Sequence, residues 1–173
     1  LIIFTFHATF KNGARKNDDA IPSGLSIYDL DHIPNPLGKW QEIEPRKEEL
    51  GIVLAHITPS SEGLRLVFII PPGMNLEQAQ AWMARQLGDA QYDACVKDFA
   101  RCSFAVPREY VLFVDEERLF SEEILYNEDA NPTTPPAAPL LPEGGELSSG
   151  NHADAARRVS TLFFVLCFLF FVL

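Results

Sequence analysis

Two apolar runs joined by a short polar turn constrain the fold of this chain more than any other feature. Gly51–Thr58 and Leu64–Ile70 are rich in β-branched and aliphatic residues, a composition typical of buried strands. The turn between them is Pro59, Ser60, Ser61, Glu62 and Gly63. The pattern predicts a β-hairpin whose tip carries hydroxyl side chains and a glycine.

Other segments predict further strands and a few helices. Strands are expected at Leu1–Phe10, Leu25–Asp31, Cys102–Val106 and Glu109–Val114. A helix is expected after Asn75, because Asn75 and Gln78 have the spacing of a capping box. Shorter helices are expected in three segments, Pro34–Leu50, Cys95–Arg101 and Glu116–Tyr126. Together these elements predict an α+β fold, a two-layer sandwich of a mostly antiparallel sheet with helices.

The composition changes after Tyr126 and divides the chain into three parts. Residues 1–126 carry enough apolar sequence for one domain. Residues 127–158 are rich in Pro, Gly and Ser, as expected of a linker without a core. Residues 159–173 are apolar but shorter than the roughly 20 residues of a spanning helix. This run is either a short tail anchor, with Arg157 and Arg158 on the cytoplasmic side, or an aberrant end of a truncated reading frame.

Charge and cysteine content limit the class of protein. A formal net charge of −10 excludes a protein coated in basic surface, so nucleic-acid binding would need a local basic patch. Lys11, Arg15 and Lys16 form such a cluster, or else a solvated loop. The three cysteines form no even disulfide framework, which is typical of the reducing cytoplasm.

Two carboxylates close the strand predicted at Leu25–Asp31. Asp29 and Asp31 point to the same face, and their Cα atoms are expected roughly 6.5–7 Å apart. Such a pair can hold one or two Mg²⁺ or Mn²⁺ ions beside a triphosphate. The alternative is a solvated turn after a strand, because Asp-x-Asp alone is a weak motif.

Two further segments carry side chains that suit a nucleotide. Near the hairpin tip, Ser60 and Ser61 offer hydroxyls, and Gly63 permits close approach of the backbone to a ligand. Arg65 offers a bidentate phosphate contact, or else is a solvent-facing strand residue.

The second of these segments follows the long helix. Asp93 could complete a metal site of three carboxylates, and Arg101 could contact phosphate. Otherwise Asp93 caps a helix, and Asp98 pairs with Arg101 on one helix face.

The order of these segments resembles the archaeo-eukaryotic primase superfamily, and more closely the VirE N-terminal domain of Bacteroidetes mobile-element proteins. The stretches that carry the resemblance are ATFKNGARK, SGLSIYDLDHI, TPSSEGLRLVF and DACVKDFARCSF, in that order. The resemblance extends from about Ala8 to Val106 and implies a primase-polymerase-like sandwich.

The resemblance also assigns roles to residues of this chain. It implies that three aspartates bind metal and act in catalysis, Asp29, Asp31 and Asp93. It implies nucleotide contacts by Ser60, Gly63 and Arg65; Ser61 and Arg101 lie beside these motifs and join the nucleotide-binding candidates. Primases usually place a histidine where this chain has Arg65. An arginine can still bind phosphate but cannot act as a neutral imidazole.

Two main hypotheses follow for function, and they leave open whether the chain is an enzyme. In the first, the domain binds a nucleotide triphosphate with Mg²⁺ or Mn²⁺ for nucleotidyl transfer in DNA replication of a mobile element. In the second, it is a catalytically inactive module that binds a nucleotide or single-stranded DNA for a partner helicase. A third hypothesis, a membrane-tethered domain whose ligand is unknown, rests only on the C-terminal run.

Overall fold

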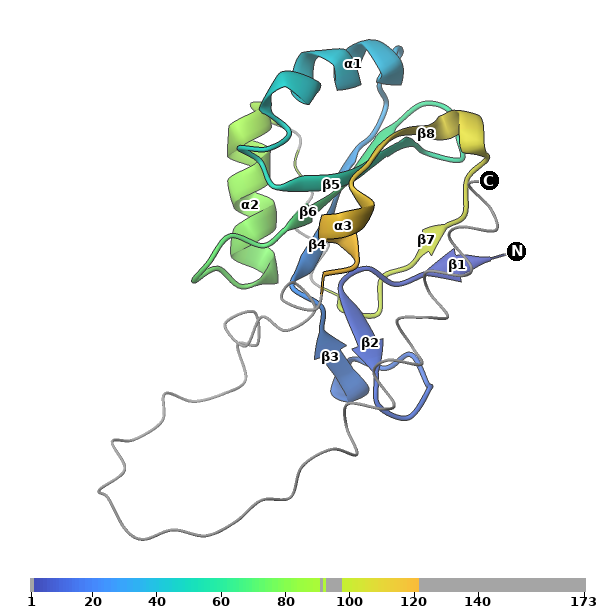
Figure 1. Cartoon of the computed structure of the whole chain (residues 1–173), viewed down its shortest axis with the longest axis vertical. Coiled ribbons are helices and arrows are strands. Elements are labelled where there is room, and N and C mark those ends of the chain that lie inside the picture. The colour runs from blue at the N-terminus through green and yellow to red at the C-terminus, as the bar shows by residue number, and fades with distance from the viewer. Residues whose placement is uncertain (1, 91, 93–97, 122–173) are drawn as a thin grey trace, which may run out of the picture.

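A four-stranded antiparallel sheet lies at the centre of the computed structural model, which describes residues 2–90, 92 and 98–121 (Figure 1). Its strands, in spatial order, are β4 (Leu25–Leu30), β6 (Leu64–Ile69), β5 (Ile52–Ile57) and β8 (Val111–Val114). The predicted hairpin is confirmed as β5 and β6, which pair antiparallel. The sequence places the start of the last strand slightly early, because Arg108–Tyr110 form a 3-10 turn before β8.

Two helices cover one face of this sheet. They are α1 (Pro36–Ile43) and α2 (Leu76–Leu87). Trp40 of α1, Met83 of α2 and Phe68 of β6 are buried together in the apolar cluster between helices and sheet. The predicted capping box is confirmed, since the Asn75 side chain accepts from the Gln78 amide at 2.9 Å and the Gln78 side chain accepts from the Asn75 amide at 3.0 Å.

Short segments from both ends of the described chain cover the other face. They are β1 (Ile3–Phe4), β7 (Ser103–Phe104) and α3 (Glu116–Leu119). The strands β2 (Ala8–Phe10) and β3 (Ala20–Pro22) lie beyond the end of the sheet at which β4 begins (Figure 1). Strand β1 pairs with β7, and β2 pairs with β3, each time antiparallel. A second apolar cluster, which includes Phe6, Val67 and Leu119, fills the space between these segments and the sheet.

The prediction of one strand at Leu1–Phe10 is wrong. The chain turns between β1 and β2, where the Thr5 hydroxyl donates to the Ala8 carbonyl at 3.0 Å and the side chains of Phe6 and His7 are buried. The backbone bends at these two residues, and the bend places Phe6 in the apolar cluster and the His7 ring against the edge of β4.

The fold class is confirmed at the level of an α+β fold with antiparallel sheets. A primase-polymerase-like sandwich stays a prediction. The helix predicted at Cys95–Arg101 lies partly outside the described residues, and so does the end of the helix predicted at Glu116–Tyr126. The predicted linker at 127–158 and the apolar run at 159–173 lie wholly outside them. Within the residues that the structure describes, no helix has the length and hydrophobicity needed to cross a membrane.

Two side chains occupy the outer edge of β4. The Ile27 amide donates to Nε2 of His7 at 2.9 Å, so Nδ1 of this ring carries the proton that it donates to the Asp98 carbonyl at 3.0 Å. The Ile27 carbonyl accepts from the Gln80 side chain of α2 at 3.3 Å. Burial lowers the pKa of His7 to about 4, so the ring is neutral in the folded protein near pH 7.

This buried ring should make the protein less stable in mild acid. In the unfolded chain His7 titrates near its ordinary pKa of 6.5, whereas the folded value is about 4, so the unfolded state binds the extra proton between these values. Stability is therefore retained above pH 6.5 and lost as the pH falls toward 4. We expect His7→Gln to reduce the loss of unfolding free energy between pH 7 and pH 5 by about 2 kcal/mol, measured by urea denaturation. An identical loss in both proteins would contradict this role.

Candidate functional site

A buried ion pair joins the edge strand β4 to the central strand β6. Asp29 and Arg65 lie directly opposite each other in the register of the two strands. Nε of Arg65 is 2.5 Å from Oδ1 of Asp29, and Nη2 is 2.7 Å from Oδ2, so the contact is bidentate. The side chains are only 9% and 11% exposed. Arg65, which was predicted to contact a phosphate, is thus bound to a carboxylate of its own chain.

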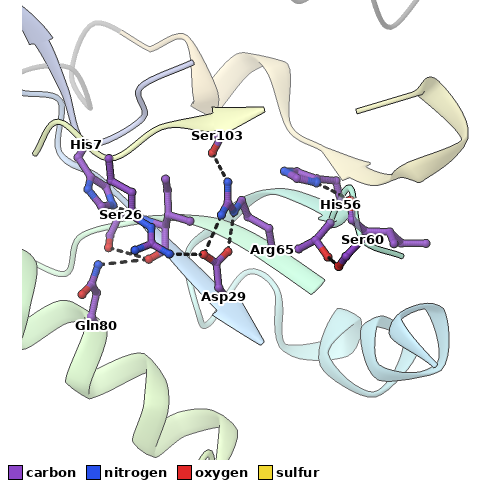
Figure 2. Close-up of polar contacts among 12 residues, drawn as sticks. His7, Ser26, Asp29, His56, Ser60, Arg65, Gln80 and Ser103 are labelled. Atoms are coloured by element: carbon purple, nitrogen blue, oxygen red, sulfur yellow. Dashed lines mark hydrogen bonds and ion pairs between the residues drawn. The ribbon is translucent and has the colours of Figure 1, made fainter. Parts of the chain in front are cut away.

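The segment around β7 completes this cluster from above the sheet (Figure 2). Arg101 donates through Nη2 to Oδ2 of Asp29 at 3.0 Å, and its side chain remains 35% exposed. The Ser103 hydroxyl accepts from Nη1 of Arg65 at 2.7 Å. The structure therefore brings together three of the predicted site residues, Asp29, Arg65 and Arg101.

Two guanidinium groups around one carboxylate leave this site electropositive. Burial by itself would raise the pKa of Asp29, but the hydrogen bonds and charge of Arg65, together with the charge of Arg101, outweigh it and lower the pKa. Asp29 thus stays ionised, and the three side chains carry a net charge of one positive unit. Both oxygens of Asp29 already accept hydrogen bonds, so the group that can take a further anionic partner is the more exposed Arg101.

Sequence reasoning missed His56, which continues the same row of residues. His56 of β5 lies opposite Arg65 and is buried. Burial, with a smaller contribution from the charge of Arg65, lowers the pKa of His56. The pairing of His56 with Arg65 could have been predicted by counting residues outward from the hairpin turn, because the loop length sets which residues lie opposite each other.

The predicted residues at the hairpin tip contact other parts of the chain. The Ser60 hydroxyl lies 3.0 Å from the Thr58 hydroxyl. Ser61, at a φ of 65°, places its hydroxyl 2.6 Å from that of Tyr110. The Ser60 hydroxyl thus makes a contact within the hairpin tip, and the Ser61 hydroxyl connects the tip to the turn that precedes β8.

The glycine of the tip allows a close approach within the protein. A Cβ atom on Gly63 would lie 2.8 Å from the Thr58 Oγ1 and 3.0 Å from the Leu30 carbonyl oxygen, distances that real Cβ atoms hardly tolerate. The absence of a side chain at Gly63 thus lets the tip pack against the end of β4. The structure shows no open space at this position for a ligand.

The remaining predicted metal ligands are not gathered around Asp29 in the part that the structure describes. Asp31 follows the end of β4, is exposed and makes no hydrogen bond or ion pair there, and Asp93 lies outside the described residues. Those residues contain no group of three His, Cys, Asp or Glu side chains that could hold a metal ion. A divalent cation at Asp29 would also face the positive charges of Arg65 and Arg101. The described residues alone therefore do not fit Mg²⁺ or Mn²⁺, and a site completed by Asp93 stays a prediction.

The two aspartates of the motif should differ sharply in their effect on stability. Asp29→Asn would leave Arg65 buried without a counter-charge, and removing one partner of a buried pair costs about 3–5 kcal/mol. Asp31→Asn is the matched control, because Asp31 is exposed and should change the unfolding free energy by less than about 0.5 kcal/mol. Chemical denaturation of both variants without metal would measure the difference. Equal effects would mean that the ion pair does not stabilise the fold.

Comparisons were made with family models, with curated proteins and with solved structures, and none of them gives a match to this chain.

Proposed function

We propose that this domain is a primase-polymerase-like module that binds the phosphates of a nucleoside triphosphate through Arg101, with Arg65 and Asp29 holding Arg101 in position. The observation that carries the proposal is the cluster of two arginines around the single carboxylate of Asp29. The order of motifs, which resembles the VirE N-terminal domain, supports a nucleotide as the ligand.

The different roles of Arg65 and Arg101 follow from the contacts that each arginine makes. Arg65 has its Nε and both terminal nitrogens engaged by Asp29 and Ser103, and it is almost buried. Within the described residues the Arg101 side chain makes one hydrogen bond, through Nη2, and it is the more exposed of the two. A guanidinium fork with free donors is well suited to phosphate oxygens. Arg65 therefore acts as the positioning residue, and Arg101 contacts the ligand.

The charge of the cluster favours binding over metal-dependent transfer. A nucleotidyl-transfer site needs carboxylates free to bind cations, whereas the negative charge of Asp29 is already balanced by its two arginines. A module that binds nucleotide without catalysing transfer, for a partner such as a helicase, is consistent with this arrangement. Nucleotidyl transfer with Mg²⁺ or Mn²⁺ is the competing proposal, and it requires Asp31 and Asp93.

Calorimetric titration of ATP in the presence of EDTA tests the proposal on the full chain. We expect binding without metal, and we expect Arg101→Gln to weaken it by about 10- to 150-fold, because a hydrogen bond to a charged group contributes about 1.5–3 kcal/mol. The variant should fold normally, since Asp29 keeps its bidentate contact with Arg65.

Two further variants serve as controls for this titration. Arg85→Gln changes an exposed arginine of α2, on the other side of the sheet, and should leave the affinity unchanged. Asp31→Asn should also leave it unchanged. If ATP instead binds only with Mg²⁺ or Mn²⁺ and Asp31→Asn abolishes that binding, the metal-dependent proposal replaces ours. Equal affinities of the wild type and Arg101→Gln would overturn the role of Arg101.

A further inference from the structure

Three polar side chains form a row across adjacent strands on the face opposite to α1 and α2. Asp29 of β4 lies opposite Arg65 of β6, and Arg65 lies opposite His56 of β5. Residues in such register point to the same face of a sheet. Elsewhere this face carries apolar side chains, such as Ile27 and Val67. The row is therefore a local polar strip in an otherwise apolar surface (Figure 2).

One ring nitrogen of His56 has no partner in this strip. Nδ1 lies 2.8 Å from the Ile57 carbonyl oxygen, which can only accept, so Nδ1 carries the proton and Nε2 has a free lone pair. Nε2 makes no hydrogen bond to any part of the chain that the structure describes. Figure 2 shows the ring turned toward the guanidinium group of Arg65.

Nε2 is nevertheless not fully buried. Among the described residues, the one fully buried side-chain nitrogen or oxygen atom without a partner is Oε1 of Gln80. Nε2 of His56 is also without a partner but is not fully buried, although the residue as a whole is only 4% exposed. Ligand binding would remove water from this acceptor, and an unsatisfied buried acceptor costs free energy. A ligand that supplies a hydrogen-bond donor at this position avoids that cost.

The chemistry of Nε2 limits what can bind to it. A lone pair requires a hydrogen-bond donor, and an ionised phosphate offers none. The sugar hydroxyls of a nucleotide do offer a donor. Asp29 and His56 are two strand spacings apart, or about 10 Å, a separation that the length of a nucleoside triphosphate can bridge.

We infer that His56 accepts a hydrogen bond from a sugar hydroxyl of the nucleotide whose phosphates bind at Arg101. The inference rests on the proposed function and adds a selectivity to it. The arginine cluster recognises phosphate, and His56 distinguishes a hydroxyl-bearing nucleotide from one that lacks these hydroxyls.

The test compares ATP with 2′,3′-dideoxyATP, which lacks both sugar hydroxyls, by titration against the wild type and against His56→Leu. The wild type should bind ATP about fivefold more tightly, the fold-change of an ordinary neutral hydrogen bond. His56→Leu should bind both ligands equally, at the affinity that the wild type has for the dideoxy compound. His56→Gln keeps an acceptor oxygen and should retain part of the preference.

The outcomes separate this inference from the proposed function. Equal binding of the two nucleotides by the wild type would overturn the inference and leave the phosphate site intact. A preference that persists in His56→Leu would assign the hydroxyl contact to another residue and also overturn it. Failure of the wild type to bind ATP at all would instead overturn the proposed function. Thermal unfolding confirms that each variant is folded, and His56→Phe, which keeps a ring but has no acceptor, serves in place of His56→Leu if the latter is not.

Discussion

The bidentate contact between Asp29 and Arg65 is the interaction on which the arrangement of this domain depends. The two side chains are the charged members of a sheet face that is otherwise mainly apolar, and each lies directly opposite the other. A slip of one residue between β4 and β6 would move one of the two charges to the face covered by the helices, where apolar residues are packed, and would leave the other charge without its partner. The ion pair thus fixes the register of the two strands, at a desolvation cost that its two short hydrogen bonds offset.

The same pair also determines where the later part of the chain lies. Arg101 and Ser103 are distant from Asp29 and Arg65 in sequence, yet each donates or accepts a hydrogen bond at the pair. These contacts hold β7 above the sheet, where it pairs with β1. A single buried polar cluster therefore connects the N-terminal strands, the central sheet and the segment after α2. This explains why the site is built from residues so far apart in the chain.

Local features could be predicted from the sequence, whereas contacts between distant segments could not. The hairpin, the capping box of α2 and the strand that ends near Asp29 each follow from neighbouring residues. The bend at Phe6 was missed because it depends on burial against α3 and the sheet, which no local pattern reveals. The pairing of Arg65 with Asp29 does not follow from local sequence, because it depends on the register of β4 and β6, two strands that are not consecutive in the chain. Two complementary charges on adjacent strands satisfy each other first when they share a register.

The edge of β4 has a consequence for how the protein behaves at high concentration. An edge strand with unpaired amide and carbonyl groups can recruit a strand from another molecule and begin aggregation. At Ile27 both backbone groups are already occupied, by His7 and Gln80. Capping by side chains thus hinders intermolecular sheet extension at the middle of this edge without a further strand. Growth of the central sheet by strand addition is therefore favoured at β8, the strand at its opposite edge.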